Sequence, residues 1–247
     1  MDMQAIDAAA KLLRASRSMV ALTGAGFSRP SGIPDFRSSG GLWERHNPAE
    51  VASLHSFHHT PRRFYDWFRP LVRTIEVAIP NAAHYALAQL EQERKLRALI
   101  TQNIDGLHQR AGSREVYELH GHLRTARCTE CEREVPTAGV MKAIDRGQIP
   151  ACSCGGVFKP DVVLFDEMLP RGLYWLAQRA LDHADLMLVA GTSLEVAPVC
   201  DMPGHVKRRG APLIVINLDE THADEHADVV IRADVAKALP LIVERAK

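Results

Sequence analysis

The chain has 247 residues, of which 46% are hydrophobic and 24% are charged, as expected of a globular protein with one large domain or one domain carrying a smaller module. Lys and Arg together number 30, as do Asp and Glu, so the formal net charge is zero. This balance argues against direct binding of nucleic acid, which usually goes with a basic excess. We expect neither a signal peptide nor a membrane span, and therefore a cytoplasmic location.

Helical patterns and short apolar runs alternate along most of the chain. In chain order we predict a helix at 6–14, a strand at 18–22, a helix at 81–94 with Asn81 as its N-cap, a strand at 96–100, a helix at 172–183, a strand at 186–190, a helix at 203–209, strands at 213–217 and 229–232, and a helix at 235–246. Short buried strands between helices predict a Rossmann-like α/β fold with a doubly wound parallel sheet.

Two stretches interrupt this alternation. Residues 37–80 contain His, Pro, Trp and Phe without strand signals, and residues 125–158 contain four of the five cysteines. We predict that they form the helical part and the zinc-binding part of one smaller inserted module. Residues 1–36, 81–124 and 159–247 would then form the larger, nucleotide-binding domain.

Glycines and polar residues follow four of the predicted strands directly. They are the loop that starts at Gly24, the pair Gln102 and Asn103, the turn 191–193, and Asn217. Ligands of open α/β sheets bind at the carboxyl ends of the strands, so these segments indicate one shared site. Glycines there allow backbone N–H groups to approach a phosphate. A dehydrogenase-type GxGxxG would need glycine where the chain has Arg29, so the pattern favours a nucleotide but not hydride transfer.

The cysteine spacing predicts a metal site. Cys128 and Cys131 form a C-x-x-C pair, and Cys152 and Cys154 form a C-x-C pair further along the chain. Four thiolates complete the tetrahedral shell of Zn²⁺ and leave no position for a substrate, so one structural zinc ion is expected. Such an ion would hold together an insertion too small to fold around its own core. Cys200 is expected to be a buried apolar side chain.

An ordered set of motifs between residues 22 and 235 resembles the sirtuins, the Sir2-type NAD-dependent protein-lysine deacylases, in their single-domain bacterial and archaeal form. The motifs are GAGFS at 24–28, SGIPDFR at 31–37, TQNIDGLH at 101–108, LHG at 119–121, the two cysteine pairs, PDVVLF at 160–165, GTSLEV at 191–196 and INL at 216–218. The order of the whole set, rather than any single motif, makes the resemblance specific.

The resemblance implies a reaction and its catalytic residues. The bond between nicotinamide and ribose in NAD is cleaved, the acyl oxygen of a modified lysine attacks ribose C1′, and lysine, nicotinamide and O-acyl-ADP-ribose are released. Asn103 and His120 would be catalytic, with His120 as general base. An imidazole with an unperturbed pKa of about 6.5 suits that role at neutral pH. The alternative for His120 is a packing role at a strand end.

The resemblance also implies contacts with NAD as co-substrate. The residues concerned are Gly24, Ala25, Gly26, Ser28, Asp35, Phe36, Arg37, Gln102, Asn103, Ile104, Asp105, Gly191, Thr192, Ser193, Asn217, Leu218, Asp219 and Val235. Asn103 and Asp105 would hold the ribose side and the nicotinamide amide, and Phe36 would shield the reacting centre. Turn formation around Asn103 and core packing of Phe36 are the alternatives.

Acylated-lysine proteins are the partners that the resemblance implies. Segment 161–167 would add the substrate peptide as an extra strand, with contacts at Val163, Leu164, Phe165 and Glu167, and Tyr65 would lie near the acyl group. The family usually has glycine before this glutamate, whereas this chain has Asp166, which could shift preference toward basic peptides. Relatives that prefer succinyl-lysine carry Tyr-x-x-Arg here, whereas in this chain Phe68 stands three residues after Tyr65. Trp67 and Phe68 are therefore expected to form an apolar lining suited to acetyl and short neutral acyl groups.

Other functions stay open at the level of sequence. The same scaffold could support an NAD-dependent protein ADP-ribosyltransferase, since that activity also needs the Gly24 loop and Asn103. A zinc ribbon that binds nucleic acid conflicts with the neutral charge, and a sensor of NAD without turnover would not need His120. A metal-dependent amidohydrolase would require an open metal site that four cysteines do not supply.

Overall fold

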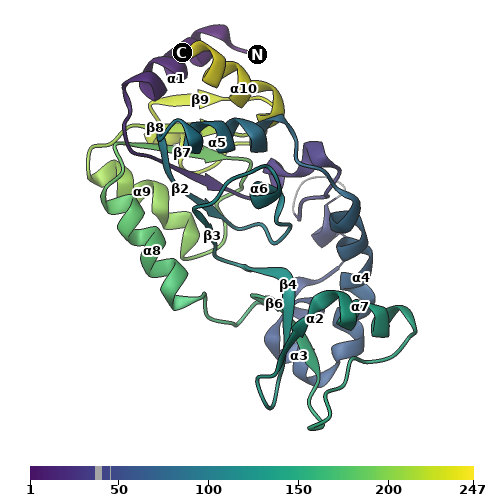
Figure 1. Cartoon of the computed structure of the whole chain (residues 1–247). Coiled ribbons are helices and arrows are strands. Elements are labelled where there is room, and N and C mark those ends of the chain that lie inside the picture. Colours follow the sequence, from purple (N-terminus) through teal and green to yellow (C-terminus); the bar gives the residue numbers. More distant parts are fainter. Residues whose placement is uncertain (37–40, 45) are drawn as a thin grey trace.

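Two sheets of different type organise the chain in the computed structural model, which describes residues 1–36, 41–44 and 46–247. The strands are β1 (Met19–Thr23), β2 (Leu96–Thr101), β3 (Val116–Glu118), β4 (Gly121–Cys128), β5 (Glu134–Pro136), β6 (Phe158–Val162), β7 (Leu186–Ala190), β8 (Leu213–Ile216) and β9 (Val229–Ile231). Six of them form a parallel sheet in the order β3-β2-β1-β7-β8-β9, and β5-β4-β6 form a small antiparallel sheet (Figure 1). The predicted Rossmann-like sheet with a smaller module is confirmed.

Helices cover both faces of the large sheet. The α-helices are α1 (Met3–Ala15), α2 (Pro48–Val51), α3 (Leu54–His59), α4 (Pro61–Val77), α5 (Ala82–Gln92), α6 (Leu107–Arg110), α7 (Thr137–Asp145), α8 (Arg171–Asp182), α9 (Met202–Arg208) and α10 (Val235–Arg245). α1, α5 and α10 pack on one face and α8 and α9 on the other (Figure 1). Burial on both sides explains why the central strands β1 and β7 read as continuous apolar runs.

Local sequence signals set the ends of these helices. The Asn81 side chain accepts a hydrogen bond from the Ala83 N–H, and the Asn81 N–H donates to His84 Nδ1, which closes the predicted N-terminus of α5 on both sides. The predicted N-cap is therefore confirmed. Asp2 caps α1 in the same way, through the N–H groups of Gln4 and Ala5.

The smaller module has its own apolar core. Phe57 of α3 and Phe64 and Phe68 of α4 pack with Met141 of α7 and with Val162 at the end of β6. Residues from both interrupting stretches therefore share one core, although residues 81–124 separate them in the sequence. β4 and β6 cross the domain limits predicted at 124/125 and 158/159, so the division of the chain into ranges stays a proposal.

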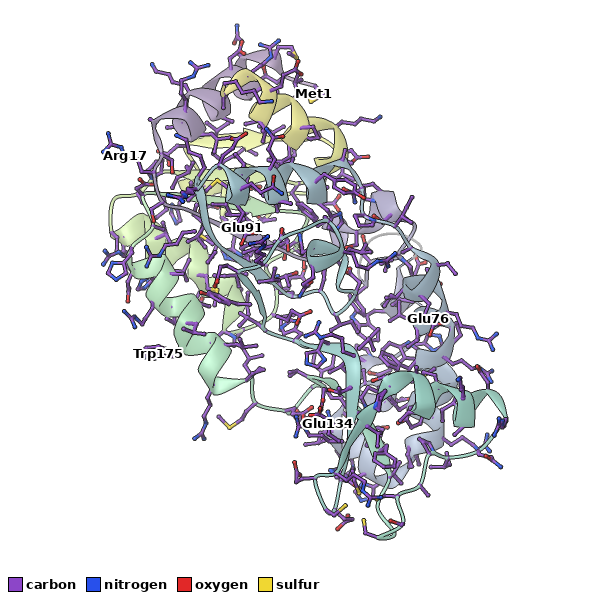
Figure 2. The ribbon with its side chains drawn as sticks, in the orientation of Figure 1. Met1, Arg17, Glu76, Glu91, Glu134 and Trp175 are labelled. Carbon is purple, nitrogen blue, oxygen red and sulfur yellow. The ribbon has the colours of Figure 1, made fainter. Side chains whose placement is uncertain are left out.

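None of the helices in the described residues is long and apolar enough to cross a membrane. α8, for example, is amphipathic, with one side packed on the sheet and the other facing solvent. Trp175 projects from it into solvent (Figure 2), with the Arg179 guanidinium 4.9 Å from the centre of its ring.

Candidate active site

A cavity of about 1130 Å³ lies where the two sheets meet. The register of the parallel sheet explains its position, because Thr23 pairs with Thr101 and Ala190, and Ala190 pairs with Ile216. The residues that follow these positions therefore leave the sheet at one edge. The described residues predicted to contact NAD all line this cavity, together with His120: Gly24, Ala25, Gly26, Ser28, Asp35, Phe36, Gln102, Asn103, Ile104, Asp105, Gly191, Thr192, Ser193, Asn217, Leu218, Asp219 and Val235. Arg37 lies outside the described residues.

The loops after β1 and β7 touch through their backbones. Gly191 has φ +62°, and a Cβ there would lie 2.2 Å from the Phe27 nitrogen; a Cβ on Gly24 would lie 2.7 Å from the Thr192 Cβ. Glycine is therefore required for this close approach. The Thr192 hydroxyl also accepts a hydrogen bond from the Gln102 side chain at 2.9 Å, which ties in the loop after β2.

Asn103 is the centre of a hydrogen-bond network on the cavity wall. Its Nδ2 donates to the Gly24 carbonyl at 2.9 Å and to Ser28 Oγ at 3.1 Å, and Ser28 Oγ donates to Asp105 Oδ2 at 2.7 Å. Both amide donors are thus used inside the protein. In the described part of the chain no donor is bonded to Asn103 Oδ1, which leaves this acceptor for a ligand.

Burial raises the pKa of Asp105 above its usual range. Hydrogen bonds from the Leu107 N–H, at 2.8 Å, and from Ser28 act in the opposite direction, because they stabilise the ionised carboxylate. The Ser28 hydroxyl is therefore one of the groups that favour the ionised form of Asp105.

Buried rings and hydroxyls of the large domain, all of them neutral, support the Asn103 network. The rings of Phe27, His84 and His108 all contact one another: the Phe27 centroid is 4.9 Å from that of His84 and 5.1 Å from that of His108, and the two histidine centroids are 4.7 Å apart. Burial lowers the pKa of His84 to about 3 and that of His108 well below its usual value. Nε2 of His108 is 2.9 Å from the Thr23 hydroxyl, which is bonded to the Thr101 hydroxyl at 2.9 Å. Thr101 Oγ1 accepts from the Asn103 N–H at 3.0 Å, so the core fixes the backbone of Asn103.

His120 occupies the connection between the two sheets, between β3 and β4. The next residue, Gly121, has φ +81°, and a Cβ there would lie 2.0 Å from the Asp161 carbonyl oxygen. Only glycine can therefore turn the chain so close to β6. The His120 carbonyl accepts from the Val163 N–H at 2.8 Å, and the His120 side chain lines the cavity.

Aromatic residues form the apolar part of the cavity wall. Phe64, Trp67 and Phe68 of α4 line it with Phe36 and Trp43, and the Trp43 and Trp67 rings stack at 5.5 Å with an interplanar angle of 15°. The predicted positions of Trp67 and Phe68 agree with this geometry. Sequence reasoning missed Trp43, whose signal was a large aromatic residue two positions after a glycine pair.

Tyr65 is placed differently from the prediction. It does not line the cavity; its side chain is buried in the core of the small module and its hydroxyl donates to the Phe158 carbonyl. The reason is helical phase, since the neighbouring Phe64 takes the cavity side and a one-residue step turns Tyr65 by about 100°. Burial raises the pKa of Tyr65, so it stays neutral.

The loop after β6 forms the other side of the cavity mouth. The cavity is lined here by the four residues predicted to contact the substrate peptide: Val163, Leu164, Phe165 and Glu167. The Phe165 N–H donates to the Ala52 carbonyl, and the Leu54 N–H donates back to the Phe165 carbonyl, both at 2.9 Å. The Glu167 carboxylate turns inward instead, accepting from the Leu164 N–H at 2.9 Å and pairing with Lys159 at 3.1 Å. Arg171 and Tyr174 of α8 also line the cavity and were not predicted.

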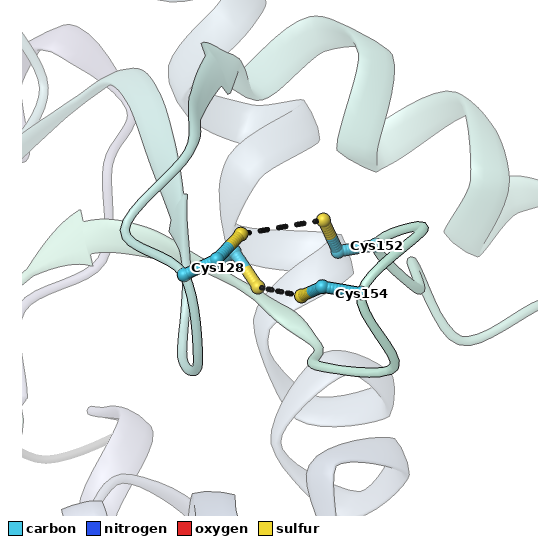
Figure 3. Close-up of side chains that lie close together, drawn as sticks. Cys128, Cys152 and Cys154 are labelled. Carbon is cyan, nitrogen blue, oxygen red and sulfur yellow. Dashed lines mark hydrogen bonds between the residues drawn. The ribbon is translucent and has the colours of Figure 1, made fainter.

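The four paired cysteines form a second cluster that is separate from the cavity. Their sulfur atoms all lie within 4.8 Å of one another, and Cys128, Cys152 and Cys154 point toward one another in Figure 3. The Cys128–Cys154 and Cys131–Cys152 sulfur distances are 3.4 and 3.7 Å. Zn–S bonds of about 2.3 Å in a tetrahedron require sulfur atoms about 3.8 Å apart, so a zinc ion fits. The backbone N–H of Cys154 lowers the pKa of Cys152 to about 6, which favours the thiolate.

Comparison with known proteins agrees with this geometry. The model of the Sir2 family matches residues 24–198. An NAD-dependent protein deacetylase of Sulfolobus acidocaldarius is 46% identical over 95% of this chain and 92% of its own, and an NAD-dependent protein deacylase of Archaeoglobus fulgidus is 42% identical over 97% of this chain and 95% of its own.

Solved structures show the same relationship at the level of the fold. A structure from work on the mechanism and regulation of Sir2 enzymes has a TM-score of 0.94 at 41% identity and covers 99% of this chain and 98% of its own. A Sir2 complex with a deacetylated p53 peptide and 3′-O-acetyl ADP ribose has a TM-score of 0.93 at 37% identity, with the same coverage. With its sequence, its fold and the arrangement of its cavity all in agreement, this chain belongs to the Sir2 family.

Proposed function

We propose that this protein removes acetyl and other short neutral acyl groups from lysine side chains of other proteins, with NAD as co-substrate, and releases nicotinamide and O-acyl-ADP-ribose. The observation that carries the proposal is that Asn103, which follows β2, and His120, which lies in the connection between the two sheets, line one cavity. The names of the relatives support it, because they are NAD-dependent protein deacetylases and deacylases.

The cavity fits NAD in size and in chemistry. Its volume exceeds the roughly 300–1000 Å³ of ordinary small-molecule sites, which leaves room for a dinucleotide beside an acyl-lysine side chain. The glycines of the Gly24 and Gly191 loops touch and expose backbone on which phosphates can lie. We assign the adenosine half of NAD to the part of the cavity lined by residues 217–219 and Val235. NAD supplies the ribose carbon that receives the acyl oxygen when nicotinamide leaves.

The residues around that carbon have separate tasks. Asn103 offers Oδ1 to a ribose hydroxyl, while its amide donors fix it to the Gly24 loop. Asp105 accepts an N–H of the nicotinamide amide. His120, which lines the same cavity, takes a proton from the ribose hydroxyls, and Phe36 excludes water from the reacting centre.

The protein substrate enters on the side of the small module. In the three-stranded sheet β6 is an edge strand, and residues 162–167 continue its course along the cavity. An extended peptide can pair with such an edge through its backbone, which gives binding that tolerates many sequences. Trp67 and Phe68 then surround the acyl group. We further propose a cytoplasmic location, since the zinc site requires reduced cysteines.

One assay tests the activity directly. The purified protein is incubated with an acetyl-lysine peptide, with and without NAD, and nicotinamide, free lysine peptide and O-acetyl-ADP-ribose are quantified by mass spectrometry. We expect all three in equal amounts and only with NAD. ADP-ribose attached to protein, without free lysine peptide, would instead indicate an ADP-ribosyltransferase, and no NAD-dependent nicotinamide release would contradict both.

A further inference from the structure

Asp166, in the loop after β6, has an unusual backbone conformation. Its φ is +67°, in the left-handed region that side chains with a Cβ rarely adopt. Arg94, Glu132 and Leu194 are the other non-glycine residues with positive φ in the described chain, but none of them lines the cavity. Glycine would adopt this conformation without strain. The presence of a carboxylate side chain at position 166 therefore requires an explanation.

The Asp166 carboxylate has no partner within the described protein. It is exposed at the mouth of the cavity, and no hydrogen bond or ion pair in the described residues involves it. The adjacent Glu167 differs, because Lys159 and the Leu164 N–H compensate its charge. Arg171 lines the same cavity, but its guanidinium contacts the Met168 sulfur at 4.0 Å instead of Asp166. Asp166 therefore leaves one uncompensated negative charge at the mouth.

The position of Asp166 places this charge beside the path proposed for the peptide. Within the three-stranded sheet β6 pairs only with β4, and the chain continues from β6 through residues 163–165 to Asp166. Along this segment Val162 and Leu164 are buried, whereas Phe165 and Asp166 are exposed. A peptide lying on this edge with its acyl-lysine in the cavity would pass the carboxylate with a residue close in sequence to that lysine.

We propose that Asp166 is a specificity residue that selects acyl-lysine substrates carrying an arginine or lysine side chain within a few residues of the modified lysine. The inference rests on the proposed function of this site. A guanidinium or ammonium group would donate a charge-assisted hydrogen bond to the carboxylate. Because the pair is exposed, its effect is modest and weakens with salt, and a preference of about two- to fivefold is expected.

The test compares kcat/KM for acetyl-lysine peptides that are identical except for one Arg or Gln, placed in turn at each position within two residues of the acetyl-lysine. Two variants are matched. Asp166→Asn keeps a side chain that tolerates the left-handed backbone and removes the charge. Asp66→Asn makes the same change at an exposed position of α4 that does not line the cavity.

The wild-type protein should prefer Arg over Gln about two- to fivefold at one or more positions in low salt. Asp166→Asn should abolish this ratio, high salt should reduce it, and Asp66→Asn should preserve it. Equal values for Arg and Gln at every position, or an unchanged ratio in Asp166→Asn, would overturn the inference while leaving deacetylation intact. Absence of NAD-dependent deacetylation of every peptide would overturn the proposed function instead.

Discussion

The hydrogen bond between Ser28 and Asp105 predicts a change in the pH dependence of the reaction. Burial raises the pKa of Asp105, and the Ser28 hydroxyl opposes this by donating to the ionised carboxylate at 2.7 Å. The substitution Ser28→Ala removes the donor and leaves the carboxylate largely buried. The protonated form of Asp105 then gains relative to the ionised form, so the pKa rises further.

The size of the effect follows from the type of bond. A hydrogen bond to a charged group contributes about 1.5–3 kcal/mol, and the lower end applies because Asp105 keeps some contact with solvent. This corresponds to roughly a tenfold change in proton affinity. The acid limb of kcat/KM for NAD should therefore move to higher pH. The variant should also lose folding stability above the folded pKa of Asp105, and this loss should shrink as pH falls through that pKa.

The assay is kcat/KM for NAD from about pH 5 to 9, with urea unfolding at the same pH values. Ser31→Ala is the matched control, because the Ser31 hydroxyl accepts from Asn81 Nδ2 at 3.0 Å and does not contact Asp105. Ser28 also accepts from Asn103 at 3.1 Å, but that loss lowers activity equally at every pH. A folded Ser28→Ala protein with an unshifted acid limb would refute the reasoning.

Three further outcomes are expected. His120→Ala should lower kcat by about 10²–10⁴-fold and leave NAD binding intact, as for loss of a general base, whereas His122→Ala, outside the cavity, should leave kcat unchanged. Wild-type turnover in a folded His120→Ala protein would exclude His120 as the general base. Elemental analysis should find one zinc ion per chain, and Cys152→Ala should lower the melting temperature far more than Cys200→Ala; a metal-free protein with an unchanged melting temperature would contradict this. Matched peptides should show higher kcat/KM for acetyl-lysine than for succinyl-lysine, and Phe68→Arg should raise the succinyl-lysine value, because an apolar wall cannot hold a carboxylate. A succinyl preference in the wild-type protein would disprove the proposed apolar channel.

The parallel sheet was predictable because its strands are buried on both faces. The predicted strand 186–190 coincides with β7, and the predicted limits of the other four strands differ by one residue at most. β3 was missed, since Val116–Glu118 is short and contains a tyrosine and a glutamate. Its strand structure depends on pairing with β2, which no local pattern reveals.

The small module was less predictable because its order depends on distant contacts. β4 alternates irregularly between buried and exposed positions. Of its two partners, β5 lies between the two cysteine pairs in the sequence and β6 follows the second pair. The cysteine spacing located the metal site correctly in space, since ligand geometry is local. For α4, the sequence placed Phe68 and Trp67 at the cavity but could not fix the direction of Tyr65 beside them.

The two residues proposed as catalytic, Asn103 and His120, show where prediction from the sequence ends. Asn103 is held by hydroxyls and rings of the parallel sheet, whereas His120 is followed by a glycine that must pass within contact distance of β6. The position of His120 relative to Asn103 therefore depends on both sheets, through the hydrogen bond from the Leu119 N–H to the Thr101 carbonyl and through the one from the Val163 N–H to the His120 carbonyl. The junction between the sheets includes the ion pair of Glu118, a buried residue at the end of β3, with Arg124 of β4, and these two residues flank His120 from opposite sheets. Motifs point to the two side chains proposed as catalytic, but the cavity that they share lies where the two sheets meet.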